Sequence, residues 1–259
     1  MKGLKDKKFF VLDMDGTFYL GSNLIDGSMD FIEKLNQTGK GFMFFTNNSS
    51  RTSDYYIKKL ASMGCVINKD QIATSGDVTI NFLKKYYPGK KIFLLATQIV
   101  EQQFRESGIN LSTEDADAVV LTFDMTINYE KFNHACRLIR NGRDFIASHP
   151  DLNCPTEDGF IPDCGAMCAF ITASTGVKPK YLGKPYRETV DFILDRTGLD
   201  IGDIVFAGDR LYTDIATAYN HGASGLLVLS GETKAEDLIN SEIKPDYVFQ
   251  SLKEAAEAL

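Results

Sequence analysis

Short apolar runs alternate with segments of helical hydrophobic periodicity along this chain of 259 residues. The runs that we predict as strands near the two ends cover residues 8–12, 41–45, 203–208, 224–229 and 246–249. The patterns that we predict as helices there cover residues 28–37, 213–220 and 251–259. Strands that alternate with amphipathic helices typically form a parallel sheet with helices on both faces. The sequence therefore predicts an α/β fold.

The middle of the chain, residues 81–179, repeats the same alternation. Apolar runs at 91–96, 118–123 and 144–147 are separated by helical patterns at 98–107 and 129–140. Periodicity does not decide whether these elements extend the first sheet or form an inserted domain with its own sheet. The segment that follows, residues 148–165, is rich in Pro, Gly and Asp, and we expect a long, functional loop there.

The charge and the cysteines narrow the classes of function. The formal net charge is -7 and the sequence pI is about 5.1, so we expect no nucleic-acid partner and no membrane partner. The five cysteines are irregularly spaced without a CxxC pair, which favours reduced thiols in a cytoplasmic protein over a zinc site. No apolar run is long enough for a signal peptide or a membrane span.

Two carboxylates and a glycine end the first predicted strand, in the stretch Asp13-Met14-Asp15-Gly16-Thr17. Residues i and i+2 of a strand point the same way, so Asp13 and Asp15 can approach one small ligand if the chain turns at Gly16. They could share a divalent cation, or divide into nucleophile and general acid/base. An exposed Asp-Gly turn is the alternative, whereas a calcium loop fails because its twelfth position is Leu24.

Hydroxyl and amide groups end the next predicted strand, at Thr46 and Asn47. A threonine hydroxyl and backbone N–H groups at a strand end suit phosphate oxygens. Such residues are also preferred helix N-caps, which is the alternative.

Two later stretches complete the set of candidates. Lys184, before Pro185, is predicted at a helix N-terminus, where a bound anion would explain a cation that the helix dipole disfavours. Asp209 follows the strand 203–208 and could ligate Mg²⁺, with Asp214 at the start of the next helix. A solvated lysine and simple helix capping are the alternatives.

Together these stretches, "DMDGT", "TNN", "GKP" and "GDRLYTD", resemble the four motifs of the haloacid dehalogenase (HAD) superfamily. Their order and spacing are similar to subfamily IIA, the NagD-like and p-nitrophenyl-phosphatase-like branch. The resemblance covers nearly the whole chain and implies a Rossmann-like, doubly wound core with an inserted α/β cap. Residues 1–80 and 180–259 would form the core, and residues 81–179 the cap that selects the substrate.

The resemblance also implies a mechanism. Asp13 would attack phosphorus to form an aspartyl-phosphate, and Asp15 would protonate the leaving alcohol and then activate water. Lys184 would neutralise charge on Asp13 and on the phosphate. The implied function is hydrolysis of a small phosphorylated metabolite, such as a sugar phosphate, a nucleotide or glycerol phosphate.

Binding roles follow from the same resemblance. Mg²⁺ would be held at Asp13, Asp15, Asp209 and Asp214. Gly16, Thr46, Asn47 and Lys184 would bind the phosphoryl group.

Three positions depart from what many relatives have: Tyr212 replaces an acid, His149 an asparagine and Asp163 a glycine. The metal site is expected to survive because Asp209 and Asp214 are present. His149 and Asp163 lie in the predicted cap loop, so a substrate cannot be carried over from a relative. We include His149 among the candidate substrate-binding residues, beside the alternative of an ordinary loop histidine.

Other functions remain open at this point. A phosphotransferase or mutase would deliver the aspartyl-phosphate to a second alcohol instead of water. A catalytically silent phosphate-binding module would keep the fold without turnover. The resemblance also leaves a homodimer open.

Overall fold

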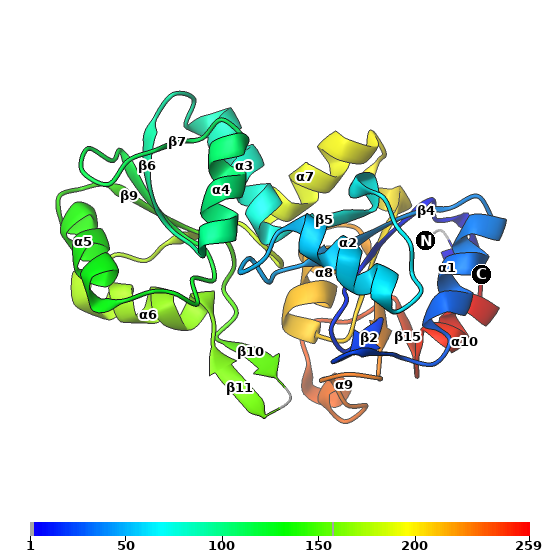
Figure 1. The fold of residues 1–259 in the computed structure, drawn as a ribbon. Helices are drawn as coiled ribbons and strands as arrows, with labels where there is room; N and C mark the ends of the chain where they lie inside the picture. The colour runs from blue at the N-terminus through cyan, green and yellow to red at the C-terminus, as the bar shows by residue number, and fades with distance from the viewer. Residues whose placement is uncertain (1–2, 157) are drawn as a thin grey trace. The chain divides into compact units, whose positions relative to one another are not determined.

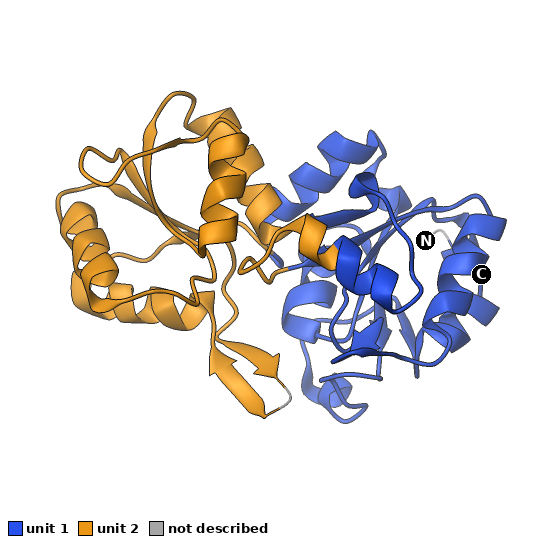
Figure 2. Ribbon diagram, in the orientation of Figure 1, with its two compact units in different colours: residues 1–46, 57–73, 184–259 blue, residues 47–56, 74–183 orange. Residues whose placement is uncertain are grey.

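The computed structural model describes residues 3–156 and 158–259, which form two compact units (Figure 2). Unit 1 comprises residues 1–46, 57–73 and 184–259, and unit 2 comprises residues 47–56 and 74–183. This division differs from the predicted one, because residues 47–56, 74–80 and 180–183 belong to unit 2.

Asp77 shows why the first two of these segments belong to unit 2. Its carboxylate accepts hydrogen bonds from Ser53 Oγ at 2.8 Å and from Gln103 Nε2 at 2.7 Å. It also accepts the backbone N–H of Thr74, whose side chain caps the helix that begins at Ser75. The Asp77 carboxylate thus connects its own segment to the segments that carry Ser53 and Gln103.

Unit 1 is built on a six-stranded sheet with the order β15-β14-β13-β1-β4-β5 (Figure 1). Its strands are β1 (Phe9–Leu12), β4 (Gly41–Thr46), β5 (Ile72–Thr74), β13 (Ile204–Gly208), β14 (Ser224–Val228) and β15 (Tyr247–Phe249). The pairings from β15 to β4 are all parallel. This confirms the predicted parallel-sheet core.

Helices cover both faces of this sheet. The α-helices whose residues lie wholly or partly in unit 1 are α1 (Ser28–Gln37), α2 (Ser53–Ser62), α7 (Arg187–Thr197), α8 (Ala216–His221), α9 (Asp237–Asn240) and α10 (Leu252–Glu257). Helix α1 packs against α10, and α7 against α8, and the two pairs flank the sheet in Figure 1. The buried side of α1 carries Phe31, Ile32 and Leu35. The sequence predicted Met29 with Ile32 and Leu35 on this side, but Met29 is exposed.

Shorter elements complete unit 1. They are the 3₁₀ turns η1 (Leu4–Asp6), η2 (Lys69–Gln71) and η3 (Ile201–Asp203), the π-helical turn η4 (Leu211–Ile215) and the antiparallel hairpin β2 (Tyr19–Leu20) with β3 (Asn23–Leu24). The helix predicted over 213–220 is thus divided between η4 and α8.

The sheet order brings three chemically important strand ends together. β13, β1 and β4 are neighbours and run parallel, so their carboxyl ends lie at one edge of the sheet. Asp13 follows β1, Thr46 ends β4, and Asp209 follows β13. Open α/β sheets bind ligands at this edge.

Unit 2 has its own five-stranded sheet, with the order β12-β9-β8-β6-β7 and parallel pairings throughout. Its strands are β6 (Lys91–Leu95), β7 (Asn110–Leu111), β8 (Ala118–Leu121), β9 (Asp144–Ala147) and β12 (Lys180–Tyr181). Its helices are α3 (Ser75–Tyr86), α4 (Gln98–Glu106), α5 (Tyr129–Arg140) and α6 (Cys164–Thr175). The question that periodicity left open is answered: the middle of the chain forms a separate sheet.

The prediction of a loop over residues 148–165 is wrong in part. Residues Asn153–Thr156 (β10) and Gly159–Pro162 (β11) pair as an antiparallel hairpin, and α6 begins at Cys164. Pro155 and Pro162 made this segment resemble a loop, because proline cannot donate to a sheet ladder. A two-stranded ribbon tolerates proline, since each strand has an edge with no partner strand.

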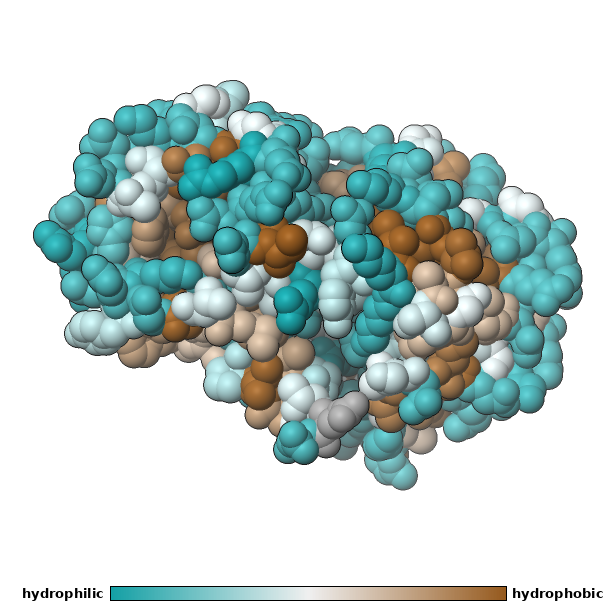
Figure 3. All heavy atoms as spheres, viewed as in Figure 1, coloured by the Kyte–Doolittle hydropathy of each residue, from teal (hydrophilic) through white to brown (hydrophobic). Residues whose placement is uncertain are grey.

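Hydrophilic side chains cover most of the face seen in Figure 3, and hydrophobic ones form small groups between them. This is the surface that amphipathic helices produce when their apolar sides face a sheet. Within the described residues, no helix combines the length and the apolar character that crossing a membrane requires.

Candidate active site

Lys184 joins two of the predicted carboxylates in unit 1. Its Nζ lies 2.7 Å from Oδ1 of Asp13 and 2.6 Å from Oδ1 of Asp214, and it also donates to the carbonyl of Phe45 at 3.3 Å. Lys184 and Asp214 are almost fully buried, whereas Asp13 keeps 16% of its side chain exposed. The nucleophile candidate is therefore the accessible member of a buried ion-pair network.

The surroundings of Lys184 correct the prediction that it stands at a helix N-terminus. Helix α7 begins at Arg187, and Pro185 lies before the helix, after a cis peptide bond. The two carboxylates, instead of an anion at a helix end, compensate the buried ammonium.

The carboxylate of Asp209 is fixed by hydrogen bonds, and two glycines lie close to it. Its carboxylate accepts the N–H of Glu232 at 2.7 Å and the hydroxyl of Thr17 at 3.3 Å. A Cβ atom on Gly16 would lie 2.5 Å from Asp209 Oδ2, and one on Gly231 would overlap the same carboxylate. Only residues without a side chain allow this carboxylate to occupy its place.

Gly208 plays the corresponding part for Asp214, because a Cβ there would overlap the Asp214 carboxylate. Sequence reasoning missed Gly208 and Gly231. The first lies inside the quoted motif, and nothing in the sequence sets the second apart from other loop glycines.

Three carboxylates converge at this edge of the sheet. One oxygen from each of Asp13, Asp209 and Asp214 lies within 4.8 Å of the other two. Ligand oxygens in an octahedral Mg²⁺ site are about 3 to 4 Å apart, and hard carboxylate oxygens are what Mg²⁺ prefers. Three of the four predicted ligands therefore form a set that fits Mg²⁺ after a small inward movement.

The electrostatics of the cluster favour a cation. Burial, and then the neighbouring Asp214, raise the pKa of Asp209 to about 6. Burial also raises the pKa of Asp13, with Asp214 and Asp209 adding to it while Lys184 opposes them. The lysine has a raised pKa because Asp13 and Asp214 outweigh its desolvation. Three carboxylates around one ammonium leave net negative charge for a divalent ion to neutralise.

Asp15 is not one of the three carboxylates of this cluster. Its Oδ2 accepts a hydrogen bond from the hydroxyl of Tyr19 at 3.2 Å. Burial raises its pKa, whereas Lys59 and the Tyr19 hydroxyl lower it. A raised pKa is what a carboxyl group needs to act as a general acid near neutral pH.

The predicted phosphate-binding residues of unit 1 lie beside these acids. Gly16 has φ +86°, a conformation that favours glycine, and its N–H donates to the carbonyl of Tyr19. Thr46 is buried at the end of β4, directly after Phe45, whose carbonyl accepts from Lys184.

Tyr212, the departure in the fourth motif, is half exposed, and its hydroxyl donates to Oε1 of Glu232 at 2.8 Å. It takes no part in the cluster formed by Asp13, Asp209 and Asp214.

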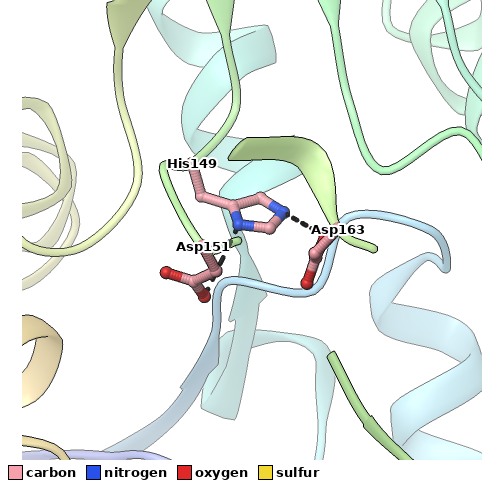
Figure 4. Close-up of side chains that lie close together, drawn as sticks. All are labelled: His149, Asp151 and Asp163. Carbon is pink, nitrogen blue, oxygen red and sulfur yellow. Dashed lines mark ion pairs between the residues drawn. The ribbon is translucent and has the colours of Figure 1, made fainter. Parts of the chain in front are cut away.

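The other two candidates, Asn47 and His149, belong to unit 2. His149 is fully buried between two carboxylates, with Nδ1 3.5 Å from Asp151 and Nε2 3.4 Å from Asp163 (Figure 4). Asn47 Nδ2 donates to Asp151. Sequence reasoning missed Asp151, although it stands two residues after His149. Contact of His149 with a substrate stays a prediction.

Comparisons with known proteins place this arrangement in a family. The haloacid dehalogenase-like hydrolase family matches residues 10–110, and a second, HAD-hydrolase-like family matches residues 181–255. The acid sugar phosphatase of Staphylococcus aureus (strain MRSA252) is 33% identical over 257 residues, which cover 99% of each chain. The 5'-nucleotidase YutF of Bacillus subtilis (strain 168) is 34% identical over 251 residues, 97% of this chain and 98% of the relative.

A solved structure agrees over the same length. The 4-nitrophenylphosphatase of Thermotoga maritima superimposes with a TM-score of 0.96 at 44% identity and covers 99% of each chain. The sequence resemblance is thus confirmed, and the chain belongs to the haloacid dehalogenase-like hydrolase family, in its NagD-like, p-nitrophenylphosphatase-like branch.

Proposed function

We propose that this chain is a Mg²⁺-dependent phosphatase of small phosphorylated metabolites that works through an aspartyl-phosphate on Asp13. Hydrolysis of phosphate monoesters follows from the family, while the metal, the covalent step and the residue roles are the proposal. The observation that carries it is the position of Asp13, partly exposed beside the Lys184 ammonium and facing Asp209 and Asp214.

The first step is an in-line displacement. Oδ2 of Asp13 forms a bond to phosphorus as the bond from phosphorus to the alcohol oxygen breaks, while Oδ1 stays on Lys184. Asp15 gives its proton to the departing oxygen, and its raised pKa supports that role. The phosphoryl oxygens gather charge in this step, and the Lys184 ammonium, which contacts Asp13, would stabilise them.

The second step reverses these roles. Asp15, now ionised, takes a proton from water, whose oxygen bonds to phosphorus as the Asp13–phosphate bond breaks. Inorganic phosphate leaves and Asp15 is protonated again. Mg²⁺, held by Asp13, Asp209 and Asp214 with the backbone of Asp15, would neutralise charge on the phosphoryl group.

Gly16, Thr46 and Asn47 are proposed to orient the phosphoryl oxygens. The relatives named as a sugar phosphatase and a nucleotidase support phosphorylated sugars and nucleotides as the first substrates to test. A cytoplasmic location and a homodimer stay predictions.

The test is phosphate release from a panel of sugar phosphates, nucleoside monophosphates, glycerol phosphate and 4-nitrophenyl phosphate. It is run with Mg²⁺ and with chelator, for the wild type, Asp13→Asn and the exposed control Asp30→Asn. We expect release that needs Mg²⁺, is lost in Asp13→Asn and is kept in Asp30→Asn. Release that persists in Asp13→Asn would refute the nucleophile, and transfer of phosphate to an added alcohol without release would favour a phosphotransferase.

A further inference from the structure

His149 lies in a buried cluster of unit 2 that the proposed chemistry does not use. Its ring is 0% exposed, and the carboxylates of Asp151 and Asp163, also buried, face its two nitrogens from opposite edges (Figure 4). Among the described residues, neither ring nitrogen has a hydrogen-bond partner of good geometry. A buried polar group in this state needs an explanation.

The charge state of the ring supplies that explanation. A neutral imidazole carries a proton on one nitrogen and a lone pair on the other, so one carboxylate would face a lone pair. An imidazolium has an N–H toward both Asp151 and Asp163. Desolvation alone would lower the pKa of His149, but the charges of Asp163 and of Cys164 as a thiolate, together with Asp151, outweigh it and raise the pKa to about 10.

A metal ion is the competing explanation, since one ligand atom each of His149, Asp151 and Asp163 lies within 4.8 Å of the others. The ring can offer only one nitrogen to one ion. Here each carboxylate faces a different nitrogen, Asp151 at 3.5 Å and Asp163 at 3.4 Å, so to ligate an ion bound at one nitrogen the carboxylate at the other nitrogen would have to leave the ring. The geometry favours the imidazolium.

The cluster leads directly to Asn47. Both oxygens of Asp151 accept from Asn47 Nδ2 at 3.2 Å, and Ser75 Oγ donates to the Asn47 carbonyl at 2.5 Å. The amide oxygen of Asn47 is confined by Gly183, where a Cβ would approach it to 2.7 Å. Asn47 is therefore fixed on three sides by residues of unit 2.

Asp163 anchors the other side of the ring. It is the N-cap of α6, with Oδ1 accepting the N–H of Cys164 at 2.6 Å, and its own N–H donates to the carbonyl of Leu152. The ring thus connects the start of a twelve-residue helix to the carboxylate that holds Asn47.

We propose that His149 is an imidazolium that bridges Asp151 and Asp163, and that it is a positioning residue that fixes Asn47 through Asp151. The part that concerns catalysis rests on the proposed function, in which Asn47 orients the phosphoryl group. The charge state of the ring does not rest on it, so the two parts can fail separately.

The charge state is tested by ¹⁵N NMR of imidazole-labelled protein between pH 6.5 and 9. The chain has three histidines, so His149→Gln assigns the signal by its disappearance. We expect the signal of His149 to show two protonated nitrogens throughout this range. A neutral ring at pH 8 would overturn the proposal. So would an equivalent of transition metal, found by elemental analysis of the purified wild type and lost in His149→Gln.

The positioning role is tested with a double-mutant cycle on His149→Gln and Asn47→Ala, with His134→Gln as the control histidine. We expect His149→Gln to lower kcat about 10-fold with a smaller change in KM, and the double variant to be no slower than Asn47→Ala. Independent, multiplying losses would overturn the positioning role, as would a loss of rate that only follows the fraction unfolded. If the wild type releases no phosphate, the proposed function fails, and the NMR result still stands.

Discussion

The ammonium of Lys184 lies 2.7 Å from Oδ1 of Asp13 and shares its charge with a second buried carboxylate, Asp214, at 2.6 Å. One ammonium group therefore compensates the charge of two carboxylates at the edge of the sheet. Such a pair is costly to break, because the remaining charges stay buried without compensation. The lysine links the stability of unit 1 to its chemistry.

We expect Lys184→Ala to lose both activity and stability. The rate should fall at least 10²-fold, as expected when a group that stabilises developing charge is removed. The free energy of unfolding should fall by about 3 kcal/mol or more, because Asp13 and Asp214 lose their cation. Kinetics and urea unfolding measure the two effects, with the exposed Lys178→Ala as control. If neither the rate nor the free energy of unfolding changed, Lys184 would have no part in the reaction and none in the stability of unit 1.

Gly231→Ala should weaken metal binding more than it slows the loaded enzyme. A Cβ at this position would overlap the Asp209 carboxylate and displace it from Asp13 and Asp214. Changing a residue that positions a metal-coordinating side chain typically lowers the affinity for the metal 10- to 100-fold. The Mg²⁺ concentration for half-maximal activity should therefore rise about 10-fold.

Gly202→Ala is the matched control for Gly231→Ala, since nothing lies within 4 Å of its Cβ position. Neither glycine has a positive φ angle, so backbone strain is excluded as the cause of a difference. Equal Mg²⁺ dependence in the two variants would show that Asp209 is not a ligand or that it can move freely.

The strand ends were predictable from the sequence because their cause is local. Asp13, Thr46 and Asp209 each follow an apolar run, and parallel strands place such residues at one edge of a sheet. The sheet order then makes these three neighbours. Reading the apolar runs as parallel strands placed these residues at one edge of the sheet, whereas their order along that edge comes from the structure.

The ion pairs of Lys184 and His149 could not be predicted in the same way. Lys184 is 171 residues from Asp13 in the chain, and only the resemblance to the family related the two. Nothing in the sequence indicated that Lys184 also pairs with Asp214. His149 and Asp163 were both noted as departures, but their proximity was not predicted, because Asp163 lies across a hairpin whose two prolines made the segment resemble a loop. Pairing across a fold depends on packing that periodicity does not describe.

Tyr19→Phe should move the pH profile of turnover. The Tyr19 hydroxyl donates to Asp15 at 3.2 Å and lowers the pKa of that carboxyl, so its removal raises the pKa further. The limb of the kcat profile that reports Asp15 should then shift to higher pH. Tyr129→Phe, an exposed position, controls for loss of a hydroxyl. A shift to lower pH, or none, would contradict the role of Asp15 as the general acid.

The imidazolium of His149 should make stability depend on pH in one direction. Its pKa is about 10 in the folded chain and 6.5 for an unperturbed histidine, so folding favours the protonated ring. This contribution is present in full below about pH 6.5 and is lost as pH rises toward 10. At most it amounts to about 5 kcal/mol, from 1.36 kcal/mol per pKa unit.

Urea unfolding of the wild type and of His149→Gln at pH 6, 7.5, 9 and 10.5 measures this contribution as the difference in free energy of unfolding. We expect the difference to be largest at pH 6 and to shrink steadily above pH 6.5. His221→Gln keeps the cluster and should follow the wild type. A difference that stays constant from pH 6 to 10.5 would mean that His149 is not charged in the folded chain, and that the ring holds Asp151 and Asp163 apart by packing alone.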